Sequence, residues 1–224
     1  MISRNKIEII SFDLVNTLYD NRPVITYAEN QSRQFLAKEF AKQGKEYNHE
    51  EFVILRNALL AESPLLFENL SLLRQTILKE LCEGLGNCNS IANGAFELFM
   101  QARLPKLIPK EIELMLEQLA AKFKLVAVTN GNCDVGKLSM GKYFHNYYSP
   151  QQGHRAKPHP QMLKKIISDY SLEPQALLHI GDQLDTDGEA AKNANCPFVY
   201  FAPFDDQDIE QHTSGLLSLI LGSN

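Results

Sequence analysis

Residues 7–20 read IEIISFDLVNTLYD, a run of β-branched and other apolar residues that ends on a carboxylate, Asp13. Apolar runs of this length that are bounded by a polar turn are typical of a buried strand. Val15 and Asn16 then precede Thr17, so the turn carries one carboxylate with an apolar side chain two positions after it. The stretch predicts a central strand that delivers Asp13 to its carboxyl end.

The composition of the chain limits the class of protein. Its 224 residues are 44% hydrophobic, enough for one substantial core with a smaller appended unit. A net charge of -5 argues against a nucleic-acid binder, which needs clustered Lys and Arg. No apolar run approaches the roughly 18 residues of a membrane span, and the four cysteines form no C-x-x-C pair. We therefore expect a cytoplasmic protein with reduced thiols and with neither nucleic acid nor membrane as a partner.

The order of the helix and strand patterns predicts the architecture. Between residues 24 and 105, apolar residues recur every three or four positions, which indicates helices. From residue 108 onward, helix and strand patterns alternate, which is typical of a parallel sheet with helices on both faces. We expect an α/β fold, a Rossmann-like doubly wound parallel sheet with an inserted α-helical cap domain. The expected boundaries are residues 1–20 and 106–224 for the core and residues 21–105 for the cap.

Single elements of the core are expected as follows. The strands are expected at residues 7–12, 124–130, near Tyr147, 176–181 and 198–201. The helices are expected at residues 109–123, 135–140, 160–170 and 185–195, with a terminal helix around residues 216–220.

Polar side chains follow several of these strands. In an open parallel sheet, ligands bind beyond the carboxyl ends of the strands. Such positions are held by Asp13, Thr129 with Asn130, Lys157 in the loop GHRAKPHP, and the acidic loop of residues 181–187. Each alone is commonly a turn residue, a helix cap or a solvated side chain. A carboxylate, a hydroxyl, an ammonium and an acidic loop at one edge are together the groups that phosphoryl transfer through an aspartyl phosphate requires.

These segments resemble the motifs of the haloacid dehalogenase superfamily, in the type that has a helical cap after the first motif. The first motif of that family reads Asp-x-Asp-x-Thr, and here it reads Asp13-Leu14-Val15-Asn16-Thr17. The run FDLVNTLYDNRPVI is similar to bacterial flavin mononucleotide and riboflavin-pathway phosphatases, which usually read FDLDDTLYDNRPVI. The resemblance implies a phosphatase of small phosphate esters that uses Mg²⁺ as cofactor, with a phosphorylated ribityl compound as a candidate substrate. We expect a monomer or homodimer.

The resemblance also implies a role for each matching residue. The catalytic residues would be Asp13 as nucleophile, Thr129 and Lys157. The residues that bind substrate would be Asn130, Thr17 and Arg22. The residues that hold the metal would be Asp13, Val15 through its main-chain carbonyl, Asp182 and Asp187, with Asp187 orienting the others.

Val15 stands where this family places its acid/base aspartate. That carboxylate would protonate the leaving group and then activate water, a contribution of about 10² to 10⁴ in rate. Because the carbonyl of residue 15 is retained, we expect a weakened phosphatase that still binds metal. His154 or His159, which flank Lys157, could supply the missing proton transfer.

Other functions remain open on the sequence alone. One is a catalytically silent protein of the same fold that binds a phosphorylated metabolite. Another is a hydrolase, transferase or lyase of the superfamily that is not a phosphatase and uses Asp13 covalently.

Overall fold

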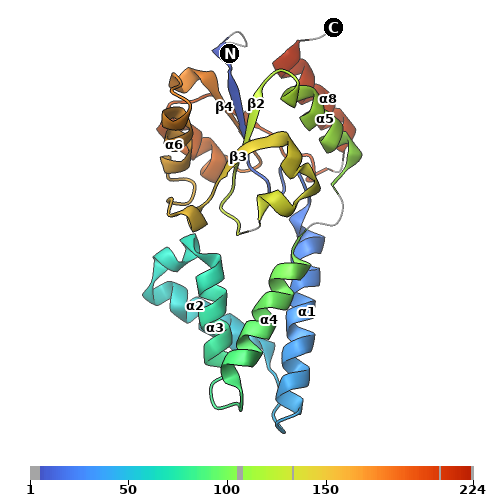
Figure 1. The fold of residues 1–224 in the computed structure, drawn as a ribbon, viewed down its shortest axis with the longest axis vertical. Coiled ribbons are helices and arrows are strands. Elements are labelled where there is room, and N and C mark those ends of the chain that lie inside the picture. Colours follow the sequence, from blue (N-terminus) through green and yellow to red (C-terminus); the bar gives the residue numbers. More distant parts are fainter. Residues whose placement is uncertain (1–5, 105–107, 133, 207, 223–224) are drawn as a thin grey trace. The chain divides into compact units, whose positions relative to one another are not determined.

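The computed structural model describes residues 6–104, 108–132, 134–206 and 208–222. The chain forms two compact units, one of Met1–Asn21 with Pro105–Asn224 and the other of Arg22–Leu104. The sheet lies in the first unit, whereas the described residues of the second unit are helices and their connections (Figure 1). The role of the second unit as a cap stays a prediction.

A parallel sheet of five strands organises the first unit. The strands are β1 Ile9–Phe12, β2 Lys124–Val128, β3 Phe144–Tyr148, β4 Leu177–Gly181 and β5 Phe198–Tyr200. Their order is β3-β2-β1-β4-β5, and each of these neighbouring pairs is parallel. The strand that carries Asp13 at its end is therefore central, between β2 and β4. The α/β fold expected from the sequence is confirmed.

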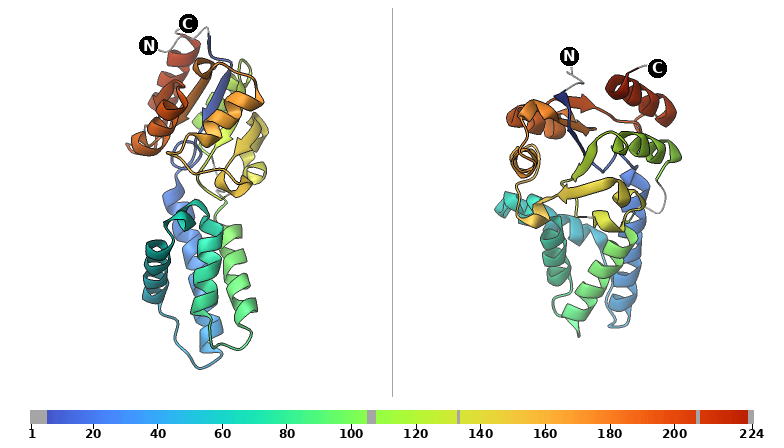
Figure 2. Two further views of the ribbon diagram at one scale, coloured as in Figure 1. Left: turned by 90° about the vertical axis from the view of Figure 1, so that its left-hand side faces the viewer. Right: turned by 45° about the horizontal axis from the view of Figure 1, so that its top comes forward.

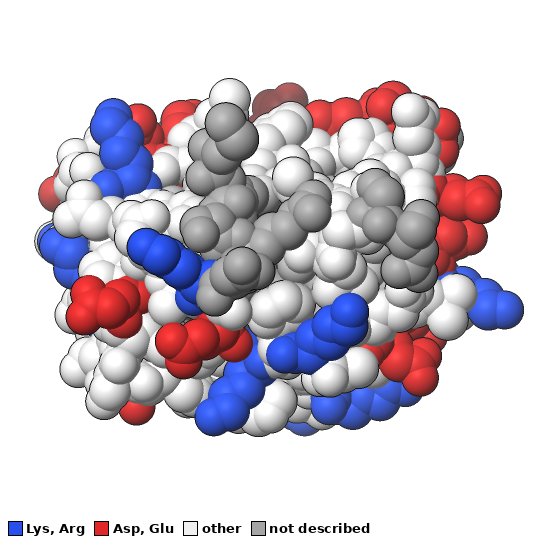
Figure 3. All heavy atoms as spheres, turned by 90° about the horizontal axis from the view of Figure 1, so that it is seen from above, with Lys and Arg blue, Asp and Glu red and all other residues white. Residues whose placement is uncertain are grey.

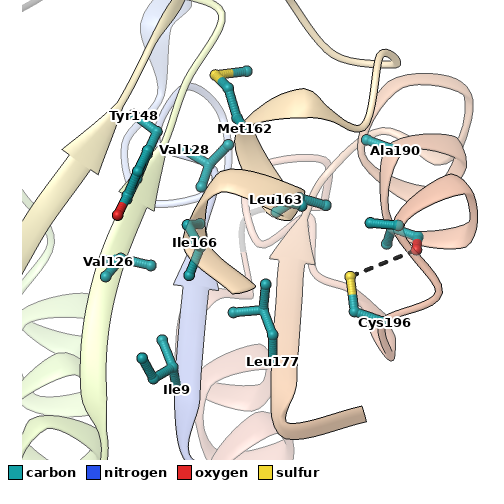
Figure 4. Close-up of a cluster of buried hydrophobic side chains, with 12 residues drawn as sticks. Ile9, Val126, Val128, Tyr148, Met162, Leu163, Ile166, Leu177, Ala190 and Cys196 are labelled. Carbon is teal, nitrogen blue, oxygen red and sulfur yellow. Dashed lines mark hydrogen bonds between the residues drawn. The ribbon is translucent and has the colours of Figure 1, made fainter. Parts of the chain in front are cut away.

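Helices lie on both sides of this sheet (Figures 1 and 2). Their bounds are α5 Lys110–Ala120, α6 Gln161–Asp169, α7 Glu189–Ala194 and α8 Ile209–Leu221. On the α6 and α7 side, the cluster in Figure 4 joins Ile9, Val126 and Leu177 of the strands to Leu163 and Ile166 of α6. Side chains alternate along a strand, so Ser11 and His179 face the same side as Ile9 and Leu177.

Two helices expected from the sequence differ in the structure. Residues 135–140 form parts of two 3-10 turns, η3 Val135–Lys137 and η4 Ser139–Tyr143. Gly136 and Gly141 disfavour a regular helix in this stretch. The helix expected at residues 185–195 begins instead as a π-helical turn, η7 Leu184–Gly188, before α7 continues.

The helical unit has a hydrophobic core of its own. It consists of α1 Asn21–Ala41, α2 His49–Glu62, η2 Pro64–Glu68, α3 Leu70–Leu81 and α4 Cys88–Ala102. Leu36, Ile77 and Leu78 lie in the centre of this core. Arg74 of α3 pairs with Glu29 of α1, and its guanidinium lies 3.4 Å from the ring centroid of Phe99 on α4, which ties three helices together. In the described residues we find no helix whose length and apolar character would let it cross a membrane.

Candidate active site

Lys157 lies at the centre of the candidate site. Its Nζ donates to Oδ1 of Asp13 at 2.7 Å, to Oδ1 of Asp187 at 2.6 Å and to the carbonyl of Val128 at 2.9 Å. The side chain is only 2% exposed, so these bonds replace the water that the ammonium loses on burial. Three segments far apart in the sequence therefore meet at the carboxyl ends of β1, β2 and β4.

Thr17 joins a second pair of carboxylates. Its Oγ1 lies 3.2 Å from Oδ2 of Asp13 and 3.0 Å from Oδ1 of Asp182, so the two carboxylates share its single hydroxyl hydrogen. The threonine itself is fully buried. It therefore brings Asp13 and Asp182 to one hydroxyl, and any contribution to substrate binding would act through these two side chains.

Asn130 and Thr129 shape the loop after β2. The Asn130 side chain donates to the carbonyl of Lys157 at 2.8 Å and accepts from the Lys157 amide at 2.7 Å, so it clamps the lysine backbone. The Thr129 hydroxyl accepts from the amide of Gly131 at 2.9 Å and keeps a hydrogen that it can donate. A substrate contact from Asn130 would therefore have to use its main-chain amide.

Asp187 is held by three donors. Oδ1 accepts from Lys157 and lies 3.3 Å from Nε2 of His179, and Oδ2 accepts from the amide of Gln183 at 3.1 Å. Burial alone would raise the pKa of Asp187, but Lys157 and His179 together lower it below its usual range. Asp187 is thus an ionised side chain that orients Lys157, and its role beside the metal stays a prediction.

The charge balance of the site fits a divalent cation. Burial raises the pKa of Asp13 to about 6. The nearby carboxylates of Asp187 and Asp182 also raise this pKa, whereas Lys157 lowers it. Burial likewise raises the pKa of Asp182. Three carboxylates thus surround one ammonium, and a cation beside Asp13 and Asp182 would offset the excess negative charge.

The side chains alone do not complete a metal site. Within the described part of the chain, no group of three or more His, Cys, Asp or Glu side chains is placed to hold a metal ion. Mg²⁺ commonly takes one or two carboxylates and completes its shell with water and substrate phosphate. The donor set expected here, Asp13, Asp182 and the carbonyl of Val15, meets that requirement.

Asn16 has a structural role in the turn after β1. Its backbone is left-handed, with φ of 60°, a region that Asn tolerates better than most residues. Its Oδ1 accepts from the amide of Asn21 at 3.0 Å, where α1 begins. Val15 beside it is half-buried. Asn16 therefore shapes the turn, and Val15 places an alkyl side chain beside it.

The sequence also predicts roles for Arg22, His154 and His159. Arg22 belongs to the helical unit, and its contact with substrate stays a prediction. His159 accepts from the amide of Gln161 at 3.2 Å at the start of α6, and the ring of His154 lies 6.1 Å from that of Tyr148. Both histidines thus have local structural contacts, and rescue of proton transfer by either stays a prediction.

Sequence reasoning missed Ser11 and His179. Both are fully buried beneath the site, and Oγ of Ser11 lies 2.9 Å from Nδ1 of His179. The available signal was a polar side chain in the middle of each of two apolar strands, IISF and LLHIG.

The chain resembles a known protein family and several known proteins. The family model described as haloacid dehalogenase-like hydrolase matches residues 7–195. A 5-amino-6-(5-phospho-D-ribitylamino)uracil phosphatase, YigB of Escherichia coli strain K12, is 28% identical over 216 residues, 95% of this chain and 90% of the relative.

Two solved structures resemble the chain as well. The crystal structure of a 2-haloacid dehalogenase from Pseudomonas syringae pv. tomato DC3000 has a TM-score of 0.82 at 30% identity, over 89% of this chain and 88% of that one. The HAD-hydrolase YfnB of Bacillus subtilis, crystallised with magnesium, has a TM-score of 0.65 at 14% identity, over 96% and 99%, and shows the shared fold. By the extent of the family match and by these likenesses, the chain belongs to the haloacid dehalogenase-like hydrolases, and the hydrolase class expected from its sequence is confirmed.

Proposed function

We propose that the protein is a Mg²⁺-dependent phosphatase of small phosphorylated metabolites that works through an aspartyl phosphate on Asp13. The observation that carries the proposal is the buried cluster in which Lys157 and Thr17 hold Asp13 beside Asp182. A carboxylate nucleophile, an ammonium and an acidic metal position are the parts that phosphoryl transfer needs. The likeness to a ribityl-phosphate phosphatase makes ribityl phosphates, including flavin mononucleotide, the first substrates to test.

In this mechanism an oxygen of Asp13 attacks phosphorus while the bond to the leaving alkoxide breaks. Water then attacks the aspartyl phosphate, its phosphorus–oxygen bond breaks, and Asp13 and phosphate are released. Lys157 keeps Asp13 ionised and, with the Thr129 hydroxyl, offsets charge on the phosphoryl oxygens. Bound Mg²⁺, held by Asp13, Asp182 and the carbonyl of Val15, would neutralise phosphate charge.

The proton that the leaving alkoxide needs has no carboxylate source at residue 15. Water, His154 or His159 must therefore supply it, and the missing carboxylate also slows activation of the second water. We infer that positioning and charge still accelerate the reaction, at a rate reduced by roughly 10² to 10⁴ from that of an enzyme with the acid/base group.

Phosphate release from flavin mononucleotide, 5-amino-6-(5-phospho-D-ribitylamino)uracil and p-nitrophenyl phosphate tests the proposal. We expect release that requires Mg²⁺ and that disappears in Asp13→Asn, a matched variant that removes the charge and keeps the shape. Equal background rates for the native protein and this variant would contradict it. Tight binding of a phosphate ester without turnover would instead identify a silent binding protein.

Hydrolysis of a carbon–halogen bond is the second candidate. The likeness to a 2-haloacid dehalogenase favours it, as does the alkyl side chain of Val15, because a halide ion leaves without a proton. This reaction needs no Mg²⁺, whereas the charge balance around Asp13 and Asp182 fits a metal. Halide release from 2-chloropropionate that is insensitive to a chelator would support it over the phosphatase.

A further inference from the structure

Two polar side chains lie in register under the candidate site. The pairing of β1 with β4 sets Ser11 opposite His179, and both side chains are 0% exposed. They point to the side of the sheet where the surrounding cluster, including Ile9, Val126 and Leu177, is apolar (Figure 4). Polar groups in such a place are costly unless they are hydrogen-bonded. The hydrogen bonds of Ser11 and His179 therefore indicate the role of these two side chains.

Hydrogen bonds connect this pair to the nucleophile. Ser11 Oγ lies 2.9 Å from Nδ1 of His179, and Nε2 of His179 lies 3.3 Å from Oδ1 of Asp187. The same Oδ1 of Asp187 accepts from Lys157 at 2.6 Å, and Lys157 donates to Asp13 at 2.7 Å. The chain thus runs from the middle of the sheet to the side chain that would attack phosphorus.

The positions of the hydrogens follow from the partners. Asp187 is an ionised acceptor, so Nε2 of His179 must carry the hydrogen that faces it. Burial lowers the pKa of His179 and favours the neutral ring, so Nδ1 is then an acceptor. The hydroxyl of Ser11 lies 2.9 Å from this Nδ1 and 3.3 Å from the carbonyl of Leu178, and at the shorter distance it donates to Nδ1. Asp187 thus sets the tautomer of His179, and Ser11 supports it from the other side of the ring.

We propose that Ser11 and His179 form a buried relay that fixes the carboxylate of Asp187 and thereby positions Lys157 against Asp13. His179 is a positioning residue, because it acts through Asp187 and Lys157. The catalytic consequence of the relay rests on the proposed function. Its geometric consequence, a fixed position of the Lys157 ammonium, does not depend on the proposed function.

The backbone next to the relay leaves the Asp187 side chain little space in which to move. A Cβ built on Gly181 would lie 2.3 Å from Cγ of Asp187, so the carboxylate packs directly on the end of β4. Packing limits its translation, and the hydrogen bond from His179 limits its rotation. Loss of the His179 donor should therefore turn the carboxylate and weaken its hold on Lys157.

The variants His179→Phe and His179→Gln separate positioning from packing. Phenylalanine keeps the ring and removes the donor, whereas the glutamine amide can still donate to Asp187. We expect kcat for p-nitrophenyl phosphate to fall by about 10- to 100-fold in His179→Phe with little change in KM, and to recover largely in His179→Gln. A fall of less than twofold in His179→Phe, or equal losses in both variants, would overturn the relay.

Nuclear magnetic resonance of ¹⁵N-labelled protein gives a readout that needs no turnover. We expect the native His179 ring to be protonated at Nε2, and the Lys157 ammonium signal to be slow to exchange in the native protein and in His179→Gln but not in His179→Phe. A native ring protonated at Nδ1, or a Lys157 signal unchanged in His179→Phe, would contradict the relay. If the native protein releases no phosphate, the proposed function fails, and these signals still decide the relay.

Discussion

The main-chain carbonyl and the side chain of residue 15 would have different roles in the proposed reaction. The carbonyl can bind metal whatever the side chain is, whereas proton transfer needs a carboxylate at this position. With Val15, the cluster of Asp13, Thr17, Lys157 and Asp182 is intact, but residue 15 has no carboxylate for proton transfer. We therefore expect Val15 to lower the reaction rate without changing the structure of the site.

Val15→Asp should therefore increase phosphatase activity. The new carboxylate would stand two residues after Asp13, where it can protonate the leaving group and activate water. We expect kcat/KM for p-nitrophenyl phosphate to rise by about 10² to 10⁴. Val15→Asn is the matched control, because its amide has a similar shape and transfers no proton near neutral pH. Equal rates in the two variants would show that another part of the site limits turnover.

Lys157→Met should destabilise the fold as well as abolish activity. The substitution leaves the buried carboxylates of Asp13 and Asp187 without their shared ammonium. Breaking a buried ion pair by removal of one partner costs about 3–5 kcal/mol, which urea unfolding would measure.

Lys192→Met is the control for Lys157→Met. Lys192 pairs with Glu189 on the exposed surface of α7, where an ion pair contributes less than about 1 kcal/mol. Similar losses of unfolding free energy in the two variants would contradict the central structural role of Lys157.

Residues at the strand ends could be predicted from the sequence, whereas residues within the strands could not. Asp13, Thr129 and Asp182 follow apolar runs, Lys157 lies in the loop between a short strand and the next helix, and the carboxyl ends of parallel strands meet at one edge. Ser11 and His179 are recognised only when the register of β1 with β4 is known. That register depends on packing across the whole sheet, which local sequence patterns do not contain.

At the scale of elements, the turn after β4 is one part that sequence periodicity did not describe. The pattern predicted a regular helix over residues 185–195, and the structure begins it with the π-helical turn η7. The hydrogen bonds from Lys157, His179 and Gln183 hold Asp187 within this turn. Contacts with other elements therefore override helix periodicity where the chain must place Asp187.

Gly181→Ala should disrupt this turn. The added methyl group would lie 2.3 Å from Cγ and 2.4 Å from Oδ2 of Asp187, so the carboxylate that holds Lys157 must shift. Overpacking of this kind costs about 1–3 kcal/mol, and we expect activity to fall with the free energy of unfolding measured in urea.

Gly215→Ala in α8 is the matched control for Gly181→Ala. A Cβ at Gly215 meets no atom within 4 Å. Alanine in the interior of a helix is favoured over glycine by about 0.5–1 kcal/mol. The same substitution should therefore stabilise the protein at residue 215, and a loss of stability at both glycines would contradict the steric argument.

At the scale of the molecule, two separate hydrophobic cores support two units. One core joins the sheet to α6 and α7, and the other lies among α1 to α4. On the face in Figure 3, acidic and basic side chains are interspersed, without a large patch of one sign. The net charge of -5 supports our proposal of a small phosphate ester, and not a polyanion, as the partner.

Metal binding at the strand ends should stabilise the fold around the central sheet. At a Mg²⁺ concentration about 100-fold above Kd, a ligand that binds only the folded state adds about 2.7 kcal/mol. For a chain of this size, that is a rise in Tm of about 5–10 °C. A chelator should reverse the rise. Asp182→Asn should abolish it, and Asp185→Asn, an exposed carboxylate of the same loop, should retain it.

The rise in Tm should also depend on pH. Burial raises the pKa of Asp13 to about 6, so below pH 6 the folded protein holds a proton there that Mg²⁺ must displace. Each pH unit below 6 should weaken Mg²⁺ binding about tenfold. The Tm rise measured by differential scanning fluorimetry at one fixed Mg²⁺ concentration should therefore be smaller at pH 5 than at pH 7.5. An equal rise at both values would show that Asp13 is not a ligand of the metal.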